Sequence, residues 1–424
     1  MAPSADQIDD LAAFVRASPS SYHAAAEAAR RLIAAGFRAQ DEAAEWDSSP
    51  GGHVVVRGGA VIAWRIPDGA GPLTPFRMIG THTDSPSFKL KPNPGIASAG
   101  YRQLGVEIYG SPLLNSWLDR ELGLAGRLVT DGEVRLVSSG AIARIPQLAL
   151  HLDRGVNDDG LKLDKQRHTQ PVWSLGDSGR DVLDHLAELA RLRAADVLGY
   201  DLMIFDTARP AVFGPVGEFL ASGRLDNLSS VHASLTALIS AADAGVIPLI
   251  AAFDHEEIGS ESTSGASGPL LADIVHRISG GLGADHDHRH RALVRSLCLS
   301  ADAGHAVHPN YPERHDPGNK PVLNGGPLLK INSNQRYATD ALGAALWRRC
   351  CVAAGVAGQE FVSNNTVPCG STIGPLTATR LGVMTIDVGV PLLSMHSARE
   401  LAGVEDPPAL ARAMEAFLAF DAPI

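Results

Sequence analysis

The chain has 424 residues, of which 45% are hydrophobic, which is enough for a packed core and favours two domains. Its 36 Lys and Arg against 47 Asp and Glu give a formal net charge of −11, which argues against a nucleic-acid or membrane-surface binder. No stretch of the sequence has the uninterrupted apolar length of a membrane span.

The first part of the chain changes from helical to strand-like patterns. Two helical patterns occupy residues 8–36 and are separated by Ser18-Pro19-Ser20-Ser21. The residues from Val54 to Ile66 and from Phe76 to Gly80 favour strands, because they are apolar and bounded by turn residues.

The strand predicted at Phe76–Gly80 runs into Thr81-His82-Thr83-Asp84. Residues two apart on a strand share a face, so His82 and Asp84 point the same way. An imidazole that binds a metal commonly donates its other N–H to a carboxylate. We therefore expect His82 to bind a metal and Asp84 to help orient the site.

The pattern becomes β-rich after Lys91-Pro92-Asn93-Pro94-Gly95. Asp131-Gly132, flanked by strand-like triplets, is typical of a two-residue hairpin. We predict that residues 95–220 form an inserted β-rich domain, and that 1–94 with 221–424 form a discontinuous α/β domain. The sequence leaves the position of the domain boundary near residue 220 open, because helical and strand-like patterns are mixed before it.

Asp226 lies just before a helix predicted from Leu228 to Ala242. A carboxylate in that position is commonly a helix cap. With the neighbouring candidate ligands in view, a carboxylate that bridges two metals becomes the better interpretation.

Glu256 and Glu257 follow the apolar run Val246–Ala252, which predicts a buried strand. A hydrolytic metal site uses such a pair, because one carboxylate holds the metal and the other takes a proton from the attacking water. An isolated Glu-Glu pair would more often be a solvated acidic turn.

Two further apolar runs, Leu297–Ser300 and Val383–Val390, precede groups of the same chemistry. In open α/β sheets the ligand crevice lies beyond the carboxyl ends of the strands, so these groups are expected to converge. The expected groups are His82, Glu257, Asp302 and His396. His and carboxylate donors without a thiolate suit zinc, cobalt or manganese.

The densest histidine run, Asp285-His286-Asp287-His288-Arg289-His290, resembles a metal-binding tract by composition. It follows a Gly-rich stretch and precedes a predicted strand, which favours a solvated loop instead.

The ordered motifs together resemble those of the aspartyl aminopeptidases, a family of dinuclear zinc metallo-aminopeptidases. The motifs are Gly80-Thr81-His82-Thr83-Asp84-Ser85-Pro86, Arg224-Leu225-Asp226-Asn227, Asp254-His255-Glu256-Glu257-Ile258-Gly259-Ser260, Ser300-Ala301-Asp302-Ala303-Gly304-His305-Ala306-Val307-His308-Pro309-Asn310 and Met395-His396-Ser397. The resemblance covers nearly the whole chain.

The resemblance implies two zinc ions per chain, with cobalt or manganese as possible substitutes. His82 and Asp302 would complete one metal site, and Glu257 and His396 the other. Asp226 would bridge the two ions, and Glu256 would be the general base.

The resemblance also implies substrate contacts and a large assembly. Glu256, His305, Lys330 and Tyr337 would contact the peptide, and Lys330 would select an acidic side chain. The inserted domain, residues 95–220, would serve oligomerisation, and residues 1–94 with 221–424 would form the catalytic domain. His151 would reach the active site of a neighbouring subunit in a homo-dodecamer. Taken alone, Lys330 would more often be solvated and Tyr337 a packing aromatic.

The four cysteines show no CxxC spacing and are expected to be reduced. The N-terminus shows no basic segment followed by an apolar core, so no secretory signal is expected. Both observations favour a cytoplasmic protein.

The fold predicted is α/β, a mixed central sheet with helices on both faces and an inserted β-rich domain. The function predicted is an aminopeptidase acting on peptides with a free N-terminus, preferably Asp or Glu. Two alternatives stay open: a related dinuclear-zinc deacylase or carboxypeptidase, and a non-catalytic metal-binding assembly protein.

Overall fold

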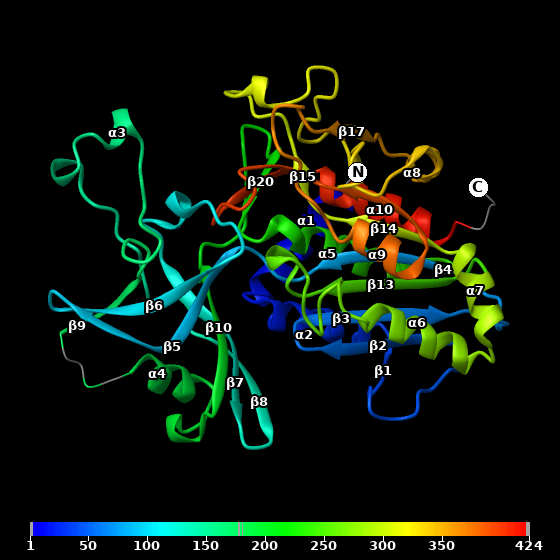
Figure 1. The fold of residues 1–424 in the computed structure, drawn as a ribbon, viewed down its shortest axis with the longest axis horizontal. Coiled ribbons are helices and arrows are strands. Elements are labelled where there is room, and N and C mark those ends of the chain that lie inside the picture. The colour runs from blue at the N-terminus through cyan, green and yellow to red at the C-terminus, as the bar shows by residue number, and fades with distance from the viewer. Residues whose placement is uncertain (1–2, 177–178, 180, 421–424) are drawn as a thin grey trace.

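The computed structural model describes residues 3–176, 179 and 181–420. Figure 1 shows two lobes, one built around a nine-stranded sheet and the other around a six-stranded sheet. We call the second, which spans Ser87–Asp206, the six-stranded lobe.

The nine-stranded sheet is mixed, with order β1-β2-β3-β13-β4-β14-β18-β16-β17. Its strands are β1 Arg38–Ala39, β2 Gly51–Arg57, β3 Ala60–Ile66, β4 Phe76–His82, β13 Ile247–Phe253, β14 Leu297–Ala301, β16 Leu328–Ile331, β17 Gln359–Val362 and β18 Met384–Gly389. The central neighbours β13, β4, β14 and β18 are parallel and run through the core. β4 and β13 are buried at every position, as strands covered on both faces must be.

Helices cover both faces of this sheet (Figure 1), because successive strand residues point to opposite sides. Ile79 and Ile250 pack into one apolar cluster with the first group of helices, whereas Met78 and Leu249 pack into another with the second. The first group is α1 Pro3–Ala17, α2 Ser21–Ala34, α5 Leu225–Ser240, α8 Ala341–Ala353 and α10 Asp406–Leu418. The second is α6 Leu270–Gly281 and α9 Gly374–Leu381. The predicted fold class is confirmed.

The six-stranded lobe is an antiparallel sheet with order β8-β7-β10-β5-β6-β9. Its strands are β5 Ser87–Ser98, β6 Tyr101–Tyr109, β7 Leu122–Thr130, β8 Glu133–Ser138, β9 Val172–Leu175 and β10 Gly199–Asp206. Short helices lie in its connections: η1 Leu114–Trp117, η2 Leu150–Leu152, α3 Val156–Asp159, α4 Val182–Leu189 and η3 Ala194–Asp196. Thr130 pairs with Glu133, so the hairpin predicted at Asp131-Gly132 is present.

A five-stranded sheet joins distant parts of the chain in the order β11-β12-β20-β19-β15. Its strands are β11 Ala211–Phe213, β12 Phe219–Ser222, β15 Gly304–His305, β19 Pro391–Leu393 and β20 Glu400–Gly403. The boundaries predicted at 95 and 220 therefore fall inside β5 and β12. We propose instead that the inserted domain extends from Ser87 to Asp206, where the strands of its sheet begin and end.

The loop predicted at residues 285–290 is a helix instead, because α7 begins at His286 and ends at Val294. The Asp285 carboxylate caps it by accepting a 2.8 Å hydrogen bond from the His288 N–H. In the described part of the chain, these histidines belong to none of the clusters whose donor atoms lie close enough to share a metal.

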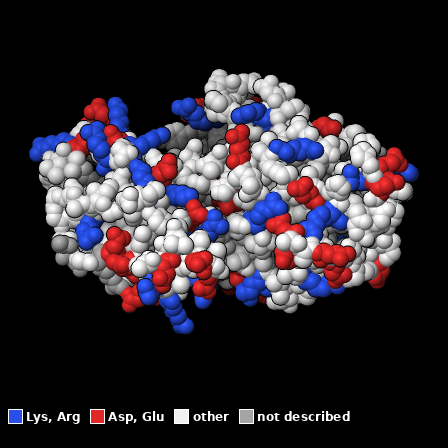
Figure 2. Space-filling view, turned by 60° about the horizontal axis from the view of Figure 1, so that its bottom comes forward, with Lys and Arg blue, Asp and Glu red and all other residues white. Residues whose placement is uncertain are grey.

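Basic and acidic side chains are interspersed among the described residues on the face shown in Figure 2. A mixed surface differs from the basic face that nucleic-acid binders present. Within the described residues, no helix combines the length and apolar character needed to cross a membrane.

Candidate functional site

Three neighbouring parallel strands deliver the first candidate ligands to one edge of the nine-stranded sheet. Phe253 at the end of β13 lies opposite His82 at the end of β4, and β14 ends at Ala301 on the other side of β4. Asp302 follows β14 directly, and the Glu256–Ile258 turn follows β13. Because parallel strands end at the same edge, these side chains meet as the sequence predicts.

Asp226 lies between two imidazoles. Its Oδ1 is 3.4 Å from Nε2 of His82, and its Oδ2 is 3.5 Å from Nε2 of His396. Asp226 and Asn227 have non-helical backbone angles, so regular helix begins only after them. The irregular backbone just before the helix thus directs the Asp226 carboxylate into the cluster. Asp226 is not a helix cap, because no side-chain hydrogen bond caps α5.

His396 reaches the cluster from the turn between β19 and β20 rather than from the end of β18. Its Nε2 lies 3.4 Å from Oε2 of Glu257. The close approach of β18 to the site requires a glycine at its end. A Cβ at Gly389 would lie 1.7 Å from the carbonyl oxygen of Asp302.

The cluster contains two overlapping groups of three, in each of which the donor atoms lie within 4.8 Å of one another. One is His82, Asp226 and Asp302, and the other is Asp226, Glu257 and His396. Asp226 is the shared member. A further combination, His82 with Glu256 and Glu257, overlaps both groups.

The donor atoms fit the zinc ions that the resemblance implies. Ligands 2.0–2.2 Å from a tetrahedral zinc ion lie roughly 3.3–3.6 Å apart. The neighbouring donor atoms here are separated by 3.4 to 3.5 Å. Asp226 Oδ1 and Glu257 Oε1 are buried and accept no hydrogen bond, so both have lone pairs free for a cation.

Both imidazoles are oriented so that Nε2 faces the carboxylates. Nδ1 of His82 lies 3.1 Å from the backbone oxygen of Asp84, and Nδ1 of His396 lies 3.0 Å from that of Ser111. A carbonyl oxygen only accepts hydrogen bonds, so each Nδ1 carries a proton, and the neutral form of each imidazole would present its Nε2 lone pair to a metal.

Asp84 holds the two adjacent glutamates in place. Its carboxylate accepts hydrogen bonds from the backbone N–H groups of Glu256 at 3.1 Å and Glu257 at 3.2 Å. It also lies 3.4 Å from Nδ1 of His82 and accepts a 2.7 Å hydrogen bond from the hydroxyl of Tyr109. Tyr109 belongs to the six-stranded lobe, and no motif in the sequence pointed to it.

The pKa values of the two glutamates are raised. Burial raises the pKa of Glu256 to about 7, an effect that His82 opposes and Asp302 reinforces. Burial and the charge of Asp226 raise the pKa of Glu257 well above its usual range. Crowded, desolvated carboxylates have a strong electrostatic preference for nearby cations.

A cavity of about 520 Å³ opens onto the cluster. Its lining includes Glu256 and all three residues expected to contact substrate from the same chain, which are His305, Lys330 and Tyr337. Burial and the charge of Lys330 lower the pKa of the His305 imidazole. The sequence thus identified residues that share one cavity.

Lys330 is almost completely buried, with 2% of its surface exposed. Its Nζ donates a 2.6 Å hydrogen bond to the Ala303 carbonyl and lies 3.8 Å from Oδ2 of Asp302. It also lies 5.4 Å from the ring centre of Tyr337, which is itself buried. A lysine is most often exposed to solvent, but that expectation is wrong for Lys330.

His151 lies apart from these residues. It is exposed on the short helix Leu150–Leu152 of the six-stranded lobe and is not among the residues that line the cavity.

A sequence model of the family described as Aminopeptidase I zinc metalloprotease (M18) matches residues 14–420. The probable M18 family aminopeptidase 2 of Streptomyces coelicolor is 54% identical, over 97% of both chains. A chain in the cryo-EM structure of the Ape4 and Nbr1 complex superposes with a TM-score of 0.94 and 34% identity, over 98% of this chain and 86% of that one. The S. cerevisiae mApe1 dodecamer gives a TM-score of 0.84 and 30% identity, over 96% and 95%.

The family model spans the segments that carry the clustered ligands and Glu256. The alignment with the Streptomyces relative covers nearly the whole length of both chains. The chain therefore belongs to the M18 family of zinc metallo-aminopeptidases.

Proposed function

We propose that the protein removes N-terminal residues, preferably Asp or Glu, from peptides at a centre of two metal ions. One observation carries the proposal: the two oxygens of Asp226 face different imidazoles, 3.4 Å from His82 and 3.5 Å from His396. This is the arrangement that a carboxylate bridging two ions requires, and Glu256 stands beside it in the same cavity.

In this proposal His82, Asp226 and Asp302 hold one ion, and Asp226, Glu257 and His396 hold the other. Zinc, cobalt or manganese at these positions would supply Lewis-acid polarisation of the scissile carbonyl. Asp84 orients the imidazole of His82 and fixes the backbone of both glutamates.

Glu256 is the proposed general base. It takes a proton from the attacking water as the water oxygen bonds to the scissile carbonyl carbon. When the C–N bond breaks, Glu256 gives the proton to the leaving amine, so the group ends the cycle ionised as it began. The burial that raises the pKa of this carboxyl group favours its uptake of the water proton.

Lys330 is the proposed determinant of acidic preference. Its ammonium group lies in the cavity wall, and a Lys ammonium has three donors. One donor is engaged by the Ala303 carbonyl. A substrate carboxylate would form a charge-assisted hydrogen bond with another.

We also propose that the chain assembles into a homo-dodecamer in which His151 serves a neighbouring subunit. The S. cerevisiae mApe1 relative is a dodecamer. His151 is flanked by Leu150 and Leu152, whose side chains are 52% and 74% exposed, as expected for a segment that a partner covers.

Mixed His151→Ala and Glu256→Gln chains should regain activity after subunit exchange; no recovery despite proven exchange would contradict a shared site.

The proposal includes a cytoplasmic location, for which the buried, unpaired cysteines Cys298, Cys350 and Cys351 give support.

A substrate screen tests the proposed function. Short peptides should be matched in all but the first residue, with Asp, Glu, Leu or Ala at the N-terminus, each with a free or an acetylated amine. An acid-preferring aminopeptidase cleaves the free-amine Asp and Glu peptides fastest and leaves the acetylated peptides intact. Faster cleavage of acetylated peptides would indicate a deacylase, and equal cleavage of all free-amine peptides would remove the acidic preference.

A further inference from the structure

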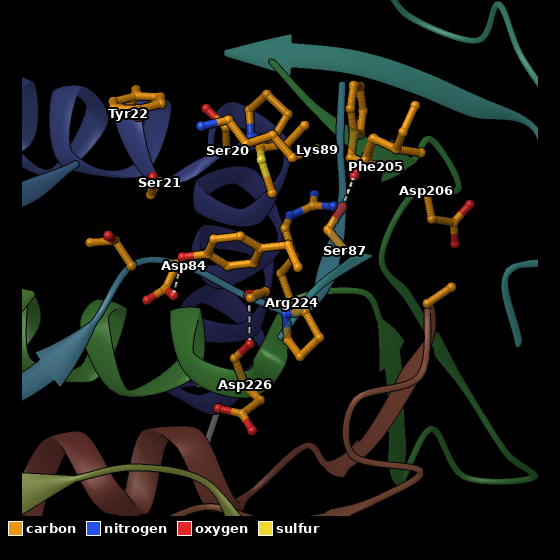
Figure 3. A pocket seen from close by; sticks show the side chains of 18 of the residues that line it. Ser20, Ser21, Tyr22, Asp84, Ser87, Lys89, Phe205, Asp206, Arg224 and Asp226 are labelled. Carbon is orange, nitrogen blue, oxygen red and sulfur yellow. Dashed lines mark hydrogen bonds between the residues drawn. The ribbon is translucent and has the colours of Figure 1, made fainter. Parts of the chain in front are cut away.

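Glu400 is a buried carboxylate that the catalytic proposal does not use. It begins strand β20 of the five-stranded sheet, and only 2% of its surface is exposed. Together with Asp84, Arg224 and Asp226 it lines a cavity between the two lobes. Figure 3 labels the last three of these residues in that cavity.

The two oxygens of Glu400 bond to the backbone of two different candidate ligands. Oε2 accepts a 3.0 Å hydrogen bond from the N–H of Asp226, and Oε1 accepts a 2.8 Å hydrogen bond from the N–H of His396. Asp226 is 174 residues away in the sequence, so one side chain ties two remote segments together.

Both segments need such support, because their backbones are irregular. His396 has a φ of +65°, in the left-handed region that L-residues seldom adopt. Arg224, two residues before Asp226, has a φ of +60°. The surrounding structure must hold such conformations in place. For His396, the Leu113 N–H bonds the backbone oxygen at 2.9 Å, and Glu400 holds the N–H.

We propose that Glu400 is a positioning residue that sets the separation between Asp226 and His396, and so supports the ion held by Asp226, Glu257 and His396. The inference rests on the proposed two-ion centre. Glu400 acts through the backbone N–H groups of Asp226 and His396 and not through their side chains. The other ion keeps His82 and Asp302, and Glu400 does not bond the segments that carry these two ligands. That ion should therefore be released more slowly than the first.

The test is zinc release from Glu400→Gln. Glutamine has the same shape but offers one oxygen and one NH₂, so it cannot accept from both N–H groups. Zinc-loaded variant and parent protein are mixed with excess colorimetric chelator, and release is followed in time. We expect one equivalent to leave at least about tenfold faster from the variant, while the second equivalent keeps nearly the parent rate.

Glu405→Gln is the matched control, because Glu405 is exposed just beyond the same strand. It should release zinc as the parent does. Equal acceleration of both equivalents in Glu400→Gln, or release at the parent rate, would overturn the proposal. Parent protein that never binds two ions would count against the proposed function instead.

Glu400→Asp gives an independent answer if the glutamine variant fails to fold, which circular dichroism of the metal-free protein would reveal. Aspartate keeps the charge, but its side chain is one methylene shorter and cannot span both N–H groups. We expect the same selective acceleration. Zinc release at the parent rate from Glu400→Asp would show that the negative charge alone suffices. It would overturn the proposal that Glu400 acts by bonding the N–H groups of both Asp226 and His396.

Discussion

The hydroxyl of Tyr109 donates a 2.7 Å hydrogen bond to the carboxylate of Asp84. Tyr109 ends β6 of the six-stranded lobe, whereas Asp84 follows β4 of the nine-stranded sheet. Asp84 in turn bonds the backbone of Glu256 and Glu257. The second lobe is therefore connected to the candidate base by two consecutive hydrogen bonds and contributes to the site.

Tyr109→Phe should lower kcat by about tenfold, the usual cost of removing an outer partner of a metal site. The hydroxyl neutralises part of the Asp84 charge, and without it the carboxylate can shift away from the glutamate backbone. Steady-state kinetics at saturating zinc measure the effect. Tyr101→Phe, at an exposed position on the same strand, is the control, and equal kcat values in the two variants would contradict the role.

The two adjacent glutamates should respond differently to the same change. Glu256→Gln should keep both ions and lose about 100-fold or more in turnover, because only proton transfer is removed. Glu257→Gln should lose metal, because it removes a ligand. Metal analysis beside kcat separates the two roles. Equal metal loss from both variants would refute the division of labour.

Lys330→Met should reduce kcat/KM for Asp- and Glu-initiated peptides about thirtyfold more than for Leu-initiated peptides. The estimate corresponds to about 2 kcal/mol for one charge-assisted contact. Methionine fills much of the same buried volume, so packing around Tyr337 is retained. Lys320→Met at an exposed position is the control. An unchanged Asp-to-Leu ratio would mean that another residue selects the acid.

Asp10 should make stability depend on acid pH. The hydrogen bond with His232, and then the charges of His232 and Arg31, lower the pKa of Asp10 to about 2, against partial burial. A lowered carboxyl pKa stabilises the folded state above the unfolded value of 3.8, and that stabilisation is lost as the pH falls from 3.8 to about 2.

Asp10→Asn should therefore unfold at a lower urea concentration than the parent at pH 7. The difference between the two urea midpoints should narrow from pH 4 towards pH 2. Asp10 is half-exposed, so solvent screening keeps the gap modest. Asp9→Asn, on the exposed face of the same helix, is the control. A gap that stays constant across this range would contradict the linkage.

The sequence predicted the candidate ligands because buried parallel strands leave a clear pattern. His82, Glu257 and Asp302 each follow an apolar run, and such runs end at one edge of a sheet. The family resemblance supplied His305, Lys330 and Tyr337, which do line one cavity. Composition alone would have placed Lys330 at the surface.

Other features left no pattern in the sequence. Tyr109 acts through a hydrogen bond to Asp84, and Glu400 through one to Asp226 and one to His396; such contacts have no periodicity or motif. The boundary predicted at 95 falls inside β5 because Lys91–Gly95 contains two prolines and a glycine, which usually break a strand. β5 continues through it with an irregularity in its pairing to β6. β12 pairs with the distant β20, which local sequence cannot show.

The central claim is a centre of two ions bridged by Asp226, and anomalous diffraction at the zinc edge tests it most directly. Crystals of zinc-loaded protein should show two peaks per chain on opposite sides of the Asp226 carboxylate. One should lie beside His82 and Asp302, and the other beside Glu257 and His396. A single peak at this carboxylate, or zinc bound only at the histidines of α7, would contradict the account.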